Sequence, residues 1–353
     1  MNSTPPISPH QFPPKATTAA NRFSATFCLL YMLFCDEMLL FVCAREKKNG
    51  LLLPWVKTFI ILLLWSMYVV SAGNVAASET GHYIAGTEGI KLASIAPPGH
   101  YYKVYNVFYN PHAIKDSSGS TYVRPDIHDY VMVHRPIWVT KKKILGADYF
   151  LDVLIPFAYA DFRVKDTGIH DSRWSLGDIC FEFFGLAWHQ ERRDEMFSLA
   201  VYIPTGTYSR RRPASLGKNF WTLLVSSGTT LYLDRDKTWA ASVLFRYEVH
   251  SRKRKERVRP GHDFTFDWAV SKNLARLWDL GLTGYCHWQI TDDSGKDVVW
   301  DKNVHDRVFA IGPEVMVYVP FLRVTCQLRH QFEFSAKDRS QGAITNISFT
   351  ILF

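Results

Sequence analysis

The sequence has few long apolar runs and few cysteines. Its mean hydropathy is only -0.09, which is too low for a bundle of transmembrane helices, because each such helix needs about 20 consecutive apolar residues. Three of the six cysteines precede residue 50, and the others, Cys180, Cys286 and Cys326, are far apart. That spacing indicates neither a disulfide framework nor a zinc site.

Motifs of the common enzyme and cofactor sites are also missing. The sequence contains no G-x-S-x-G nucleophile context and no Walker, Rossmann or zinc pattern. A lipid-modifying enzyme would need a serine and a histidine aligned by a third group, and the histidines here are scattered. We therefore expect no cofactor, no metal and no enzymatic activity.

Aromatic residues, in contrast, are abundant, with 24 Phe, 17 Tyr and 11 Trp. A polar average combined with many aromatics fits a β-barrel that has one lipid-facing and one wet face, although a soluble β-sandwich fits the composition almost as well. The formal net charge is +8. The basic run from Arg252 to Arg257 resembles a nucleic-acid patch in isolation. Between two predicted strands it is better interpreted as a charged loop tip, so no nucleic-acid partner is expected.

The N-terminal region has the features of an export signal. Basic residues from Arg45 to Lys57 precede an apolar core at 58–70, and small residues around Ala77 predict cleavage before Ser78. An uncleaved anchor helix is the alternative. Residues 1–44 are either a first membrane segment or precede the true start, which would then lie near Met38 or Leu51; we favour the second interpretation. Residues 1–77 are thus a predicted leader, 78–100 a periplasmic tether or a plug, and 101–353 a barrel.

From residue 101 onward, apolar and polar residues alternate in segments separated by polar turns. The clearest segment is 322–336, in which even positions are almost all apolar and odd positions all polar. Successive side chains of a strand point to opposite faces, so this pattern predicts a strand with one apolar and one polar face. Other strands are expected at 101–109, 129–139, 148–157, 177–188, 197–203, 220–233, 239–249, 263–271, 280–290, 309–319 and 345–353.

Short and long connections alternate between these segments. Short links are expected at 140–146, 190–195, 234–238, 273–276 and 319–320, and long loops at 110–127, 159–175, 205–219, 251–261 and 291–307. An up-and-down transmembrane barrel with short periplasmic turns and long outer loops has this alternation. The fold class is therefore all-β: a closed antiparallel up-and-down barrel of about 12 strands in the bacterial outer membrane, with outer-membrane lipid as a partner.

The last residues favour a barrel over a sandwich. Ile347, Phe349, Ile351 and Phe353 share one face of the final strand, in the manner of the strand that the barrel-assembly machinery recognises. The polar phases of the predicted strands then give the candidate lumen-lining residues, which are Arg246, Glu248, Tyr285, His287, Gln289, Glu314, Arg323, Gln327, Arg329, Gln331 and Glu333. Opposed Arg and Glu rows could line a selective pore or pair with one another and close it.

Short motifs spaced along the mature region add a family resemblance. They include Glu79-Thr-Gly-His82, Pro97-Pro-Gly99, Tyr202-Ile-Pro-Thr-Gly206 and Gly281-Leu-Thr-Gly-Tyr285. The region from 79 to 353 resembles the family named for the meta-pathway of phenol degradation (SphA-like outer-membrane proteins). This resemblance implies a barrel associated with the degradation of aromatic compounds and supplies no substrate.

These observations lead to an expected function of passive channel or transporter for small compounds, aromatic or other hydrophobic ones among them. The alternatives are a structural or surface-interaction barrel without transport and, less favoured, a lipid-modifying enzyme.

The leader assignment makes a testable prediction. N-terminal sequencing of the mature protein should give Ser78 as the first residue, because signal peptidase cleaves after small residues that follow a short apolar core. A first residue well before Ser78 would contradict the predicted cleavage.

Overall fold

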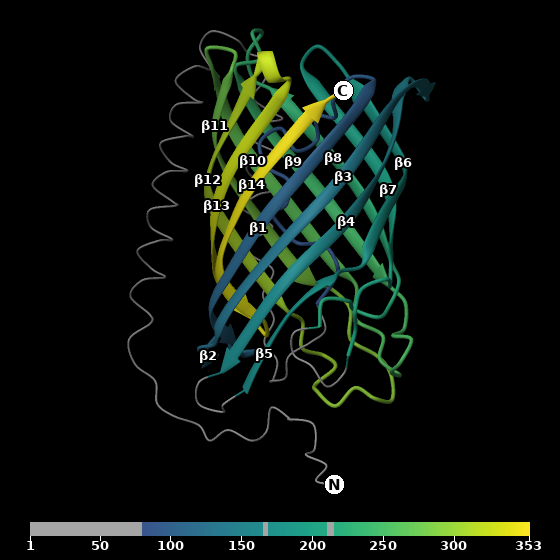
Figure 1. Cartoon of the computed structure of the whole chain (residues 1–353), viewed down its shortest axis with the longest axis vertical. Helices are drawn as coiled ribbons and strands as arrows, with labels where there is room; N and C mark the ends of the chain where they lie inside the picture. Colours follow the sequence, from purple (N-terminus) through teal and green to yellow (C-terminus); the bar gives the residue numbers. More distant parts are fainter. Residues whose placement is uncertain (1–79, 165–168, 210–214) are drawn as a thin grey trace. The chain divides into compact units, whose positions relative to one another are not determined.

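The computed structural model describes residues 80–164, 169–209 and 215–353, and most of them form β-strands (Figure 1). Twelve antiparallel strands make a closed ring. They are β1 (Gly99–Lys115), β3 (Asp126–Ile144), β4 (Ala147–Val164), β6 (Ile179–His189), β7 (Arg193–Ile203), β8 (Thr222–Tyr232), β9 (Trp239–His250), β10 (Asp263–Leu274), β11 (Trp278–Gln289), β12 (Arg307–Val319), β13 (Val324–Lys337) and β14 (Ser340–Leu352). Within the described ranges, no helix is both long and apolar enough to cross a bilayer.

The ring closes between its first and last strands. β1 pairs with β14 in a register that runs from Tyr101 opposite Leu352 to Ile114 opposite Ser340. The backbone N–H of Phe353 donates to His100 O at 3.0 Å, one position beyond that ladder. Closure leaves the twelve-stranded ring without an unpaired edge. An open sheet would expose such an edge, and exposed edges promote aggregation.

The predicted barrel and its alternation of connection lengths are confirmed, with corrections to the loops. β2 (Thr121–Val123) and β5 (Ile169–Leu176) lie outside the ring, in the predicted loops 110–127 and 159–175. β5 pairs only with β4, because both continue past the ring as a hairpin. Short turns share one end of the barrel with Gly99 and Leu352, and long loops leave the other end (Figure 1). At that second end β13 and β14 are joined by Asp338 and Arg339 alone.

Burial in this barrel is the reverse of that in a soluble domain. On β13, Leu328 and Phe332 are 48% and 51% exposed, whereas Arg329, Gln331 and Glu333 are 4%, 0% and 6% exposed. Over most of β13, the side chains that point into the ring are therefore charged or polar, and those that point outward are apolar. An apolar exterior around a polar interior is the pattern of barrels that span lipid.

Two residues of the predicted strand 322–336 are placed differently. Arg323 lies in the turn before β13, after the 3-10 turn Pro320–Leu322, with a left-handed φ of 52°. Ala336 was expected on the outward face, but it is 1% exposed and points inward. The phase changes at Ser335, where φ is 53° and where the pairing of β12 with β13 shifts register. This β-bulge adds one residue, which turns the following side chain to the opposite face.

Near the short-turn end, a bare glycine backbone carries an inward-pointing ring. Gly185 of β6 lies opposite Phe150 of β4, and a Cβ at position 185 would come within 2.4 Å of the ring carbons of Phe150. Phe150 is completely buried and belongs to an apolar cluster with Val139 and Leu244. The absence of a side chain at Gly185 therefore leaves the space that the Phe150 ring occupies.

Gly185→Ala should destabilise the barrel by about 1–3 kcal/mol, since an added methyl overpacks a filled core. Urea unfolding of the refolded protein in detergent measures the change. The double variant with Phe150→Leu should show a favourable coupling relative to the sum of the two single variants, because neighbouring substitutions that share a space are not additive. Additive effects would contradict the close packing of these two residues.

Candidate functional site

The interior of the barrel holds residues 80–98, called the N-terminal segment below. His82 contacts Asp178 and Thr222, which lie where β6 and β8 begin at the long-loop end. Lys91 pairs with Asp279, which lies near the start of β11 at the short-turn end. The segment therefore runs inside the ring from one end to the other before it enters β1 (Figure 1).

At the long-loop end, β9 and β10 hold the segment by its backbone and by one ring. The Glu248 carboxylate accepts the backbone N–H groups of His82 and Tyr83 at 2.8 and 3.0 Å. The Tyr83 hydroxyl donates to Asp267 at 2.7 Å, and the Arg246 guanidinium lies 4.1 Å from the centroid of the Tyr83 ring. A cation over a desolvated aromatic face contributes up to about 2 kcal/mol, so Tyr83 is fixed by both its edge and its face.

Glu88 is the charged centre of the segment. Its carboxylate accepts hydrogen bonds from Arg135 at 2.7 Å, from the Tyr105 hydroxyl at 2.9 Å and from Lys103 at 3.1 Å. Arg135 also donates to Asp152 at 2.7 Å and to Glu182 at 2.9 Å. The network joins the segment to β1, β3, β4 and β6.

The electrostatic balance keeps Glu88 ionised. Burial alone would raise the pKa of Glu88, but the charges of Lys103 and Arg135 outweigh it, and the pKa of the carboxyl is lowered. Removing one partner of a buried ion pair leaves an uncompensated charge and costs about 3–5 kcal/mol. Glu88 is therefore the side chain whose loss should release the segment most effectively.

The opposite wall contacts the backbone on either side of Glu88. Arg329 donates to Thr87 O at 2.6 Å and to Glu314 at 2.9 Å, and Glu314 in turn accepts the backbone N–H of Ile90 at 3.1 Å. Closer to the short-turn end, Leu92 and Ala93 pack into the apolar cluster that contains Phe150. The segment thus meets charged walls over most of its length and an apolar wall near the short turns.

Six of the candidate lumen-lining residues meet the segment directly. They are Arg246, Glu248, Tyr285, Glu314, Arg329 and Gln331. The others are engaged with the wall or the loops: His287 contacts Thr265, Gln289 contacts Asp293, Gln327 contacts Ser348 and Glu333 contacts Tyr285. Arg323 is exposed in a turn and does not belong to this interior set.

Several interior charges are absent from the predicted set. The most important are Arg135, Asp152, Glu182 and Asp267. Asp267 lies on the polar phase of a regular strand, so the alternation could have identified it. Arg135, Asp152 and Glu182 belong to strands whose alternation is irregular in the sequence, and no local signal marks them.

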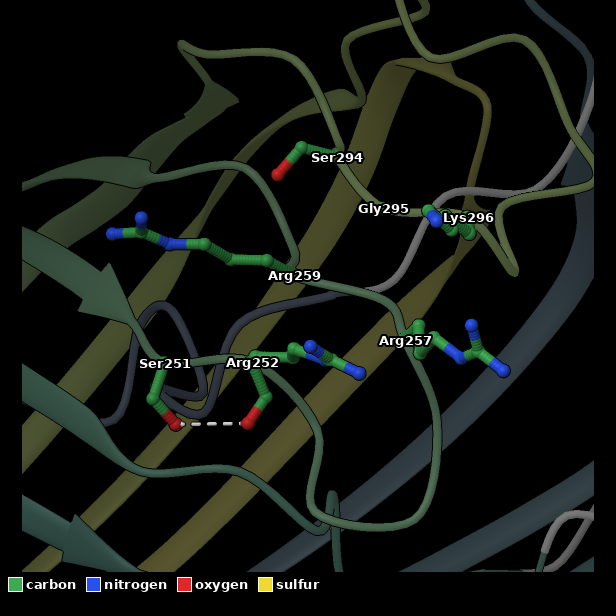
Figure 2. A pocket seen from close by; sticks show the side chains of 7 residues that line it. All are labelled: Ser251, Arg252, Arg257, Arg259, Ser294, Gly295 and Lys296. Carbon is green, nitrogen blue, oxygen red and sulfur yellow. Dashed lines mark hydrogen bonds between the residues drawn. The ribbon is translucent and has the colours of Figure 1, made fainter.

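At the long-loop end, a basic pocket opens between two loops (Figure 2). Its volume is about 800 Å³, and it is lined by Ser251, Arg252, Arg257, Arg259, Ser294, Gly295 and Lys296. An antiparallel bridge between Arg259 and Ser294 holds the two loops together. The basic run expected at a loop tip is thus part of a cationic pocket that would attract anionic solutes.

One arrangement in the interior resembles the order of an acid–histidine–hydroxyl triad. Asp178, His82 and Thr222 are linked by contacts of 2.9 and 2.7 Å. Burial lowers the pKa of His82, although the hydrogen bond with Asp178 opposes this, so the ring is neutral at pH 7. Thr222, however, is completely buried, which closes its hydroxyl to any substrate.

Comparisons with known proteins place the fold. Residues 112–349 match the sequence model of a family described as "Putative MetA-pathway of phenol degradation". No curated protein matches the chain. The structure is similar to the crystal structure of the COG4313 outer membrane channel from Pseudomonas putida F1, with a TM-score of 0.66 and 12% identity over 74% of this chain and 98% of that chain. At that identity the likeness shows a shared fold.

Weaker structural similarities were also found. The beta domain of the Bordetella autotransporter BrkA has a TM-score of 0.46 and 10% identity over 73% of this chain and 100% of that chain. A deletion mutant of the TodX monoaromatic hydrocarbon channel has a TM-score of 0.42 and 9% identity over 74% of this chain and 92% of that chain.

Glu88→Ala should free the N-terminal segment from the wall, because Lys103 and Arg135 then lose their shared carboxylate. Hydrogen-exchange mass spectrometry should show faster exchange in residues 80–98 while the strands keep their protection. Ile84→Ala is the matched control, since Ile84 is 38% exposed within the same segment. Equal exchange in the two variants would argue against Glu88 as the main anchor.

Proposed function

Because this chain belongs to the family described as "Putative MetA-pathway of phenol degradation", we propose that it is a passive channel of the bacterial outer membrane for small, aromatic or otherwise hydrophobic compounds. The observation that carries the proposal is the reversed polarity of the closed barrel, with Leu328 and Phe332 outside and Arg329 and Gln331 inside. An apolar belt suits lipid, and a polar interior suits a water-accessible path.

Support for small solutes comes from how full the interior is. Larger barrels leave an open water channel, whereas barrels near eight strands are filled by side chains. Here twelve strands enclose the N-terminal segment, which contacts the wall from Thr80 to Ala93. We propose that this segment acts as a plug that narrows the path, so the channel conducts weakly and selects by size and polarity.

Support for aromatic solutes comes from the rings of the interior. The His82 ring stacks on Tyr202 with centroids 4.7 Å apart and meets the edge of Phe220 at 4.7 Å, and Tyr83 and Tyr285 share one buried cluster. Aromatic rings favour offset-stacked or edge-to-face partners at such distances. A planar solute could use the same contacts on its way through.

A barrel with a structural or surface-interaction role and no transport is the second candidate. The dense ion pairing around Glu88 favours it, because charges that neutralise one another can close a lumen. The buried Thr222 hydroxyl gives no reason to propose catalysis.

Planar-bilayer conductance and liposome flux of phenol and benzoate separate these candidates. The purified chain should give small channels and a measurable flux of these aromatic solutes. Both should rise several-fold in Glu88→Ala and in Arg329→Ala, because each removes a contact that holds the segment. Arg323→Ala is the control, because this exposed turn residue belongs to the same stretch of chain as Arg329 and should leave conductance unchanged. Absence of conductance and flux in all variants would support the structural role.

A further inference from the structure

Two histidine rings converge on one hydroxyl at the long-loop end of the interior. The Nδ1 atoms of His82 and His250 each lie 2.7 Å from Thr222 Oγ1. The Nε2 atoms face carboxylates instead, His82 towards Asp178 at 2.9 Å and His250 towards Asp263 at 3.1 Å. The four ionisable side chains are at most 3% exposed, so these contacts are shielded from bulk solvent.

One hydroxyl group cannot donate a hydrogen bond to both histidine rings. When Asp178 and Asp263 are both ionised they only accept hydrogen bonds, so each Nε2 then carries the proton of its ring and each Nδ1 is left as an acceptor. The Thr222 hydroxyl has one proton and can satisfy only one of the two Nδ1 atoms. The other lone pair then finds a partner only when a further proton, held by a ring or by its carboxylate, or a metal ion joins the cluster.

The position of Glu248 favours the metal ion. Its Oε1 atom accepts two backbone N–H groups of the segment, whereas its Oε2 atom is buried without a hydrogen-bond partner. One atom each from His82, Glu248 and His250 lie within 4.8 Å of one another. An added proton would complete a single hydrogen bond, but a metal ion would bind both lone pairs of the rings and the orphaned oxygen.

The donor set matches the chemistry of a divalent transition metal. Two imidazoles and a glutamate with an open fourth position are a familiar zinc set, with bonds of about 2.0–2.2 Å. Metal-binding histidines commonly donate the hydrogen bond of their other ring nitrogen to a carboxylate, which orients the ring and raises its basicity. Asp178 and Asp263 contact the two rings in this way. Tetrahedral bonds of that length put the ligand atoms about 3.3 Å apart, so a modest rotation of the rings completes the site.

We propose that His82, Glu248 and His250 bind one zinc-like divalent cation, which fastens the N-terminal segment to β9. The site joins a residue of the segment to two residues of the wall, so metal binding and docking of the segment are one event. Binding free energy that is gained only in the docked state adds directly to the stability of that state. This inference stands whether or not the barrel conducts.

Zinc titration of the full-length chain in detergent, after chelator treatment, tests the proposal. One Zn²⁺ per chain should bind with a dissociation constant in the micromolar range or tighter, and Co²⁺ should give the visible absorption of a four-coordinate ion. His82→Ala should weaken binding at least about 100-fold, and Asp178→Asn about 10–100-fold, the usual cost of losing a carboxylate behind a ligand. His305→Ala, on an exposed loop next to Asp292, should change nothing.

His82 is the decisive position because it lies outside every strand, so its variant should fold even where Glu248→Gln or His250→Ala does not. Bound zinc should also slow hydrogen exchange at residues 80–84 in the wild type and not in His82→Ala. No stoichiometric binding, or binding that survives His82→Ala, overturns the proposal. A cluster that only titrates with pH and takes up no zinc would identify the missing cation as a proton and overturn it as well.

Discussion

The hydrogen-bonded seam between β1 and β14 is the constraint on which the rest of the structure depends. Backbone groups in hydrocarbon have no water to bond, and each unpaired group there costs several kcal/mol. The ladder from Tyr101–Leu352 to Ile114–Ser340 removes the sheet's last edge. Once the ring is closed, a side chain can only point inward or outward, and the alternation along every strand divides the chain chemically into an apolar exterior and a polar interior.

That division buries charged side chains inside the ring, and the N-terminal segment supplies partners for them. Glu88 neutralises cations that the wall cannot all pair on its own, and the backbone groups near Thr87 and Ile90 bond to Arg329 and Glu314. Small residues make this approach possible: a Cβ at Gly89 would come within 1.9 Å of both Glu314 and Arg329. The same low-dielectric interior that makes an unpaired charge costly therefore makes the docked segment stable.

How much could be predicted depended on the local regularity of each strand. In β13 a strict alternation identified Arg329, Gln331 and Glu333 as one face, and the pattern failed only at the bulge at Ser335. In β6, the Glu182 side chain and the direction of an added Cβ at Gly185 both face inward although the two residues are three positions apart, because the pairing with β4 and β7 shifts register between them. Such a shift interrupts the period of two, so the sequence pattern could not assign Glu182 to the inward face of β6.

By itself, the sequence determined a barrel of about twelve strands and the alternation of faces along its regular strands such as β13, since both follow from local periodicity and turn chemistry. Tertiary structure alone decided which inward groups meet. His82 and Glu248 are 166 positions apart, so no local motif of the sequence joins them. Their contact exists because ring closure brings β9 around to the segment, and closure is a property of the whole sheet that no single stretch of sequence encodes.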